Sequence, residues 1–171
     1  ITSGGKLASM AAQNGHPVLR LPGGLPPRAA LGHSLVALFA ALQSMKIMPD
    51  MSESIQETVE LLKALRDRLG TANQQASNPA KQLASSLAGK IVIIYGSSGI
   101  MEAAAYRWRS QIAENAKNLA SHHVLPEMNH NEIVSWNPAG GCLNVFHALQ
   151  LVDDFQSPDI SKRFEITQNI I

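Results

Sequence analysis

The segment 122–132 contains the densest group of side chains that can move protons or bind metals. It reads His122-His123-Val124-Leu125-Pro126-Glu127-Met128-Asn129-His130-Asn131-Glu132, with three histidines and two carboxylates. The histidine spacing does not fit one face of a helix, and Pro126 would disrupt such a helix, which argues against a zinc site. A neutral histidine that acts as an acid or base near pH 7 explains the cluster better.

A second set of candidate residues lies on the helix predicted over 101–117. Arg107, Gln111 and Glu114 share one face at spacings of four and three, and Lys117 lies one turn on. This face is either solvated, with Glu114 paired to Lys117, or it carries a catalytic carboxylate. Periodicity alone favours the solvated face.

Two glycine-rich turns and one arginine are candidate sites for an anion. The turn Gly96-Ser97-Ser98-Gly99 joins a predicted strand to a predicted helix, and Ser3-Gly4-Gly5 has a similar setting. Such turns bind phosphates through backbone N–H groups, but they also need glycine for backbone reasons alone. Arg28 follows two prolines that stiffen its loop. Residue types leave two roles open for Arg28, a ligand-binding arginine and a plain helix-start arginine.

These residues are positioned by alternating helices and buried strands. The apolar run 91–95 is typical of a parallel strand buried on both faces. Further strands are predicted over 17–21 and 143–152, with helices over 6–13, 29–46, 54–69, 79–88, 101–117 and from 158. Ser54-Ile55-Gln56-Glu57 resembles a capping box. The pattern predicts an α/β fold with a parallel sheet flanked by helices.

The helices 29–46 and 54–69 each carry one long apolar stripe. Such stripes pack either into a junction between domains or into a subunit interface, and the pattern leaves both open. The polar stretch 71–77 lacks periodicity and is the predicted linker.

Composition excludes several classes of protein. The chain has 171 residues, of which 45% are hydrophobic, enough for a packed core. Its 14 Lys and Arg nearly balance 13 Asp and Glu, so no surface for nucleic acid or an anionic membrane is predicted. The richest apolar run, 29–45, is too polar to span a membrane.

Cys142 is the only cysteine, which predicts a reducing, cytoplasmic location. Cys142 and Trp136 are expected to be packing residues.

The two ends of the sequence predict a piece of a longer protein. The chain opens on Ile1-Thr2-Ser3 without an initiator methionine and stops on the largely apolar segment 166–171. Complete domains seldom begin and end inside a regular element.

Several short motifs occur in order along nearly the whole chain. They are Thr2-Ser3-Gly4-Gly5-Lys6-Leu7-Ala8, Leu21-Pro22-Gly23-Gly24-Leu25-Pro26-Pro27-Arg28-Ala29-Ala30-Leu31, Asn78-Pro79-Ala80-Lys81, Ala105-Tyr106-Arg107-Trp108-Arg109, Glu114-Asn115-Ala116-Lys117 and Leu125-Pro126-Glu127-Met128-Asn129-His130-Asn131-Glu132. As a set they resemble the bacterial and archaeal bifunctional phosphoglucose/phosphomannose isomerases of the sugar isomerase (SIS) superfamily. That family has two SIS domains, each a flavodoxin-like three-layer sandwich. The resemblance implies the tail of the first domain over 1–45, a helical connector over 46–78 and much of the second domain over 79–171.

The resemblance also implies roles for named residues. Glu114 would be the base that moves a proton between C1 and C2 of the sugar through a cis-enediol. His130 would open the sugar ring, acting in the site of the partner subunit of a homodimer, and Arg28 would stabilise the enediolate charge. The substrate-binding residues would be Ser3, Gly4, Gly5 and Asn131.

The implied reaction converts glucose 6-phosphate, and usually mannose 6-phosphate, into fructose 6-phosphate and back. Removing a proton beside a carbonyl needs a held carboxylate and a cation at the developing oxyanion, and ring opening needs a proton donor or acceptor near neutral pKa. Neither step calls for a metal or redox cofactor, so none is predicted. The family's phosphate cradle would precede Ile1 and a catalytic lysine would follow Ile171, so the chain by itself is predicted to be inactive.

Two other functions stay open. The chain could belong to an SIS module that binds a sugar phosphate and regulates without catalysis, although such a module has no need of a base at Glu114. It could also be a zinc enzyme that uses His122, His123 and His130, which metal analysis would test.

Overall fold

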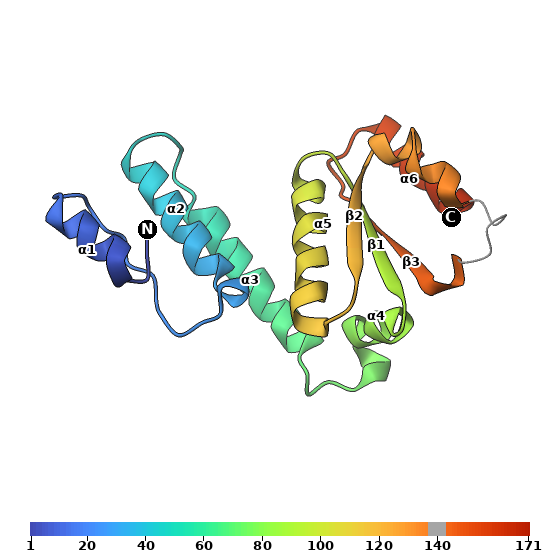
Figure 1. Cartoon of the computed structure of the whole chain (residues 1–171), viewed down its shortest axis with the longest axis horizontal. Coiled ribbons are helices and arrows are strands. Elements are labelled where there is room, and N and C mark those ends of the chain that lie inside the picture. Colours follow the sequence, from blue (N-terminus) through green and yellow to red (C-terminus); the bar gives the residue numbers. More distant parts are fainter. Residues whose placement is uncertain (137–142) are drawn as a thin grey trace. The chain divides into compact units, whose positions relative to one another are not determined.

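The computed structural model describes residues 1–136 and 143–171 and divides into two compact units, 1–78 and 79–171 (Figure 1). Cys142, predicted to be a packing residue, lies outside the described residues. Within the described ranges, no helix is both long and apolar enough to cross a lipid bilayer.

The second unit is built on a three-stranded parallel sheet. Strands β1 (Ile91–Ser97), β2 (Ala120–Leu125) and β3 (Phe146–Leu151) lie in the order β2-β1-β3, so that β1 is central. The central place of β1 agrees with the apolar run predicted to be buried on both faces. The sequence pattern does not predict β2, because His122 and His123 interrupt its apolar residues.

Helices cover both faces of this sheet. On one face, Ile94 packs against α5 (Ile100–Gln111) and α4 (Pro79–Leu87); on the other, Tyr95 packs against α6 (Pro158–Ile170) (Figure 1). Successive side chains of a strand point to opposite faces, so one apolar run supplies both cores. The predicted three-layer α/β arrangement is therefore confirmed. The first core contains Val92, Ile94, Ala105 and Ala120, and the second contains Tyr95, Leu125, Met128, Trp136 and Phe164.

Two predicted elements of this unit differ in detail from the structure. The helix predicted over 101–117 is α-helical only to Gln111 and continues as a π-helical turn, η3 (Ile112–Ala116). The strand predicted over 143–152 begins at Phe146, because a 3-10 turn, η7 (Leu143–Val145), precedes it. Two further 3-10 turns, η4 (Glu127–Asn129) and η5 (Glu132–Trp136), follow β2.

The first unit consists of helices α1 (Gly5–Gln13), α2 (Leu31–Ser44) and α3 (Ser52–Leu69), with 3-10 turns η1 (Pro27–Ala29) and η2 (Gln75–Ser77). The strand predicted over 17–21 is reduced to a single parallel bridge between Thr2 and Arg20. Residues of α2 and α3 line one apolar groove of about 750 Å³, so part of each predicted stripe faces the same groove, for example Leu35 and Val59.

The start of α3 corrects a sequence prediction. The helix begins at Ser52, so the capping box predicted at Ser54 is wrong. The Asp50 carboxylate accepts from the backbone N–H of Ser52 at 2.9 Å and from its hydroxyl at 2.6 Å. These hydrogen bonds lower the pKa of Asp50, and they move the helix start two residues earlier than the pattern predicts.

Candidate active-site residues and the family of the chain

Glu114 lies in the π-helical turn that ends α5. The turn spans Ile112–Ala116, and Lys117 closes it in the left-handed conformation with φ 55°. The ammonium of Lys117 donates to the backbone carbonyl oxygen of Glu114 at 2.7 Å. A π-helical turn and a left-handed residue other than glycine both cost energy, and both occur preferentially at functional sites. The backbone therefore marks Glu114 as a candidate where helical periodicity favours a plain solvated face.

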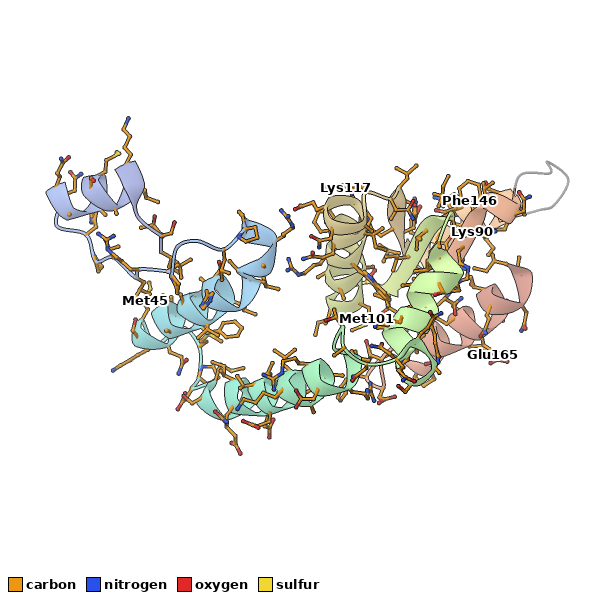
Figure 2. All side chains as sticks on the ribbon, turned by 90° about the horizontal axis from the view of Figure 1, so that it is seen from below. Met45, Lys90, Met101, Lys117, Phe146 and Glu165 are labelled. Carbon is orange, nitrogen blue, oxygen red and sulfur yellow. The ribbon has the colours of Figure 1, made fainter. Side chains whose placement is uncertain are left out.

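The Glu114 turn lies beside the amino ends of the strands. One residue past Lys117, the side-chain amide of Asn118 donates to the carbonyl oxygen of Lys90 at 2.8 Å, next to the start of β1. Figure 2 labels Met101 and Lys117, which lie near the two ends of the helix that runs back along the sheet. A groove of about 550 Å³ between α4 and the end of α5 opens here, and Lys117 and Asn118 line it.

His130 lies on a loop that follows the carboxyl end of β2. The loop is anchored before His130, where Met128 is only 1% exposed and the Asn129 amide donates to the Thr167 hydroxyl of α6 at 2.8 Å. It is also anchored after His130, where the Glu132 carboxylate contacts Tyr95 of β1 and His123 of β2. The His130 side chain itself is exposed. A fixed backbone therefore presents an imidazole that is available for proton transfer.

Asn131, predicted to bind substrate, has contacts of its own within this loop. Its amide nitrogen donates to the Glu127 carboxylate at 2.9 Å, while its oxygen accepts the Glu132 N–H. The Asn131 side chain is exposed and lines a pocket of about 390 Å³ at the carboxyl ends of β1 and β2. These contacts give Asn131 a part in shaping the His130 loop.

Sequence reasoning assigned no role to Glu132, whose carboxylate is bound at both oxygens. The Tyr95 hydroxyl donates to Oε1 at 2.5 Å, and His123 Nδ1 lies 2.8 Å from Oε2. The Trp136 indole N–H in turn donates to the Tyr95 hydroxyl at 2.8 Å. Burial, and then the hydrogen bond to Glu132, raise the pKa of Tyr95 far above its ordinary value, so the phenol keeps its proton. The only sequence signal for this network is that Glu132 stands two residues after His130 in a shared motif.

Glu114 and His130 lie at opposite ends of the second unit. The chain reaches the Glu114 turn at the amino end of the sheet, and it reaches His130 only after passing the carboxyl end of β2. A strand of the seven residues in β1 spans about 20 Å at 3.3 Å per residue. Within one unit, the two side chains are therefore too far apart to act on neighbouring atoms of one sugar.

The three histidines of segment 122–132 do not form a metal site. His122 and His123 are adjacent in β2 and so point to opposite faces of the sheet. His122 meets the Tyr106 ring of α5 at 5.2 Å, whereas His123 pairs with Glu132. Across residues 1–136 and 143–171, no three His, Cys, Asp or Glu side chains gather closely enough to hold a metal ion. The zinc hypothesis therefore has no support in the described structure.

The turn Gly96-Ser97-Ser98-Gly99 has a packing reason for its first glycine. A Cβ at Gly96 would lie 2.5 Å from the carbonyl oxygen of Met101, because α5 crosses the strand closely at this point. Two carboxylates, Glu102 and Glu127, line the pocket beside the turn. Close packing and local negative charge favour the structural interpretation of this turn over a phosphate site.

The remaining predicted site residues belong to the first unit. Gly4 and Gly5 have φ of 142° and 66°, which glycine tolerates, and they form the start of α1 directly after the bridge at Thr2. Ser3 is exposed in this turn, and Arg20 Nη1 lies 3.8 Å from where a Cβ of Gly4 would be. Arg28 is exposed in η1, just before α2. The turn thus has a nearby cation, Arg20, that sequence reasoning did not single out.

Comparison with known proteins identifies relatives of the whole chain. It is 39% identical over its full length to the bifunctional phosphoglucose/phosphomannose isomerase of Caldicellulosiruptor bescii and 32% identical to that of Aquifex aeolicus. The chain covers 50% and 49% of these two proteins, so it spans about half the length of the curated relatives it matches.

A solved structure supports the fold. The crystal structure of a glucose-6-phosphate isomerase like protein from Thermus thermophilus superposes with a TM-score of 0.63 at 19% identity, covering 96% of this chain and 55% of the other. Residues 76–171 match the family described as the bacterial phospho-glucose isomerase C-terminal SIS domain. The family resemblance carried by the motifs is thereby confirmed. Because this match extends over more than half of its length, the chain belongs to the family of the bacterial phospho-glucose isomerase C-terminal SIS domain.

Proposed function

We propose that the full-length protein that contains this chain is an aldose–ketose isomerase of hexose 6-phosphates. It would convert glucose 6-phosphate, mannose 6-phosphate or both into fructose 6-phosphate and back. The observation that carries this proposal is the pair Glu114 and His130. Both lie within the family match, one on a π-helical turn and the other exposed on an anchored loop.

Each residue has a defined chemical task in this proposal. The Glu114 carboxylate removes the proton from C2 of the open-chain aldose and delivers it to C1, while O1 gains a proton and O2 loses one, so that a cis-enediol forms between the two steps. The Arg28 guanidinium stabilises the negative charge that develops on the carbonyl oxygen during proton removal. His130 transfers a proton at the ring oxygen, which opens the cyclic sugar before isomerisation. These steps involve only proton transfers and need no cofactor.

The separation of Glu114 from His130 supports a site shared between two subunits. Because one unit cannot bring both side chains to the same sugar, we propose a homodimer in which His130 acts in the partner's site. The substrate phosphate would be bound in part by Ser3, Gly4 and Gly5 at the start of α1, and Asn131 would contact the sugar.

The proposal assigns each segment a place in the larger protein. Residues 1–45 would form the tail of a first SIS domain, 46–78 a helical connector and 79–171 most of a second SIS domain. Because the chain spans about half the length of its relatives, we expect it to have no isomerase activity by itself. Turnover by the purified 171-residue chain would contradict this expectation. A cytoplasmic location belongs to the same proposal.

A coupled assay of the full-length protein tests the proposed function. Fructose 6-phosphate is the substrate, and glucose 6-phosphate and mannose 6-phosphate are detected separately. Glu114→Gln is expected to lower kcat by several orders of magnitude, because it removes the only proposed base. The matched control is Glu165→Gln on α6, an exposed glutamate paired with Lys162, which leaves kcat unchanged. Binding of the sugar phosphate by the parent protein without turnover would instead favour a regulatory SIS module.

A further inference from the structure

Glu132 is held by contacts that the proposed mechanism does not use. We propose that Glu132, clamped by Tyr95 and His123, is a positioning residue that orients the His130 loop for opening of the sugar ring. This inference rests on the proposed function and assigns a task to residues that do not themselves touch the sugar.

The clamp joins the loop to two neighbouring strands of the sheet, β1 and β2. Tyr95 belongs to β1 and His123 to β2, and these two residues are partners in the parallel register of the strands. Their side chains bind the two oxygens of one carboxylate, at 2.5 Å and 2.8 Å. A carboxylate held at both oxygens cannot rotate freely, so Glu132 ties the backbone two residues from His130 to β1 and β2.

The surroundings of the Tyr95 hydroxyl keep it a hydrogen-bond donor to Glu132. Tyr95 is completely buried, and its hydroxyl accepts the Trp136 N–H while it donates to Glu132. Since the Tyr95 phenol stays protonated, it remains a donor to the carboxylate. The Glu132 side chain is 19% exposed, so its charge is largely removed from water and depends on these two partners.

The clamp completes a set of anchors on both sides of His130. Met128 and Asn129 hold the preceding turn against the core and α6, whereas Glu132 holds the segment that follows. Between them stands the exposed imidazole. Proton transfer requires placement to within about 1 Å, and a misplacement of that size costs about 100-fold in rate. Loss of the clamp is therefore expected to lower the rate of ring opening more than it weakens substrate binding, to which Asn131 of the same loop contributes in the proposal.

The two chemical steps can be measured separately in the full-length protein. Exchange between the α and β anomers of glucose 6-phosphate, followed by NMR, requires ring opening but no removal of the C2 proton. Isomerisation to fructose 6-phosphate requires both. Glu114→Gln is therefore expected to abolish isomerisation and to retain catalysed anomer exchange, whereas His130→Asn abolishes both.

Glu132→Gln is the test variant, because it keeps the shape of the side chain and removes its charge. We expect kcat for anomer exchange and for isomerisation to fall together by about 10- to 100-fold, with KM changed by a smaller factor. The control is Glu165→Gln on α6 (Glu165 is labelled in Figure 2), an exposed glutamate whose partner is Lys162 at 2.9 Å. It is expected to change neither rate.

Tyr95→Phe provides an independent second variant if Glu132→Gln does not fold. It removes only the hydroxyl, and it is expected to lower both rates in parallel by a smaller factor, since His123 still holds the other oxygen. Folded variants with unchanged anomer exchange would overturn the inference. A higher KM with kcat unchanged would overturn it as well. If the unmodified full-length protein itself does not isomerise fructose 6-phosphate, the proposed function fails first, and that result is distinct from either outcome.

Discussion

The substitution Gly96→Ala is expected to loosen the second unit, because the new methyl group has no space. Its Cβ would lie 2.5 Å from the Met101 carbonyl oxygen, 2.7 Å from the Met101 carbonyl carbon and 3.1 Å from the Glu102 nitrogen. All three atoms belong to the backbone of α5. Relief therefore requires the helix to move away from β1, since no side chain can rotate to make room.

The expected loss of stability in Gly96→Ala follows from the cost of overpacking a well-packed core. A clash of this kind with backbone costs about 2 to 3 kcal/mol. Native-state hydrogen exchange of the β1 amides Val92 and Ile94, measured in the full-length protein, reports the free energy of opening the sheet. At 1.4 kcal/mol for each tenfold change, exchange should accelerate by about 30- to 150-fold.

Gly32→Ala is the matched control for this substitution. Gly32 lies inside α2, and nothing comes within 4 Å of a Cβ built there. Alanine should stabilise that helix by about 0.5 to 1 kcal/mol and leave exchange of the β1 amides unchanged. Unchanged β1 exchange in Gly96→Ala, together with weaker binding of a sugar phosphate, would refute the packing explanation and restore a phosphate site at the turn.

Two further predictions concern titration and backbone strain. Burial, followed by the neighbouring charges of Arg109 and His123, lowers the pKa of His122 below its ordinary 6.5. Its imidazole should therefore titrate below pH 6.5 by NMR, and titration at or above 6.5 would be contrary to the structure. The stability of the folded protein should fall as the pH drops from 6.5 through the lowered pKa, because the unfolded chain binds this proton more tightly. Lys117→Ala should destabilise the π-helical turn by about 1 kcal/mol, because it removes the hydrogen bond to the Glu114 carbonyl oxygen and keeps the left-handed backbone. Lys117→Gly should destabilise the turn less, because glycine relieves the strain of the left-handed conformation. Hydrogen exchange of the turn amides measures the difference, and equal effects would argue against strain at this position.

The architecture of the second unit could be predicted from sequence because its signals are local. An unbroken apolar run predicts a central strand, and alternation with helices predicts a parallel sheet. The second strand could not be predicted, because His122 and His123 stand where an apolar pattern is expected. Their presence has a structural reason, since each packs or pairs with a group on a different face.

From the sequence, motifs identify single residues of the candidate site, but the local backbone and the contacts of these residues could not be predicted. Helical spacing favours a solvated face at Glu114, and it gives no sign that α5 widens into a π-helical turn before Lys117. The clamp on Glu132 could not be predicted either, because Tyr95 lies 37 residues away in sequence and becomes a partner only when β1 and β2 pair. Contacts of this range depend on strand register, which the sequence of one strand does not determine.

The central claim is that each active site takes Glu114 from one subunit and His130 from the other. It is tested most directly by mixing full-length Glu114→Gln and His130→Asn proteins under conditions where subunits exchange. About half of randomly formed dimers combine the two variants, and each of these contains one complete site, so activity should return to about a quarter of the unmodified level. If mixed dimers are demonstrated and no activity returns, the site is not shared in this way, and the account is contradicted.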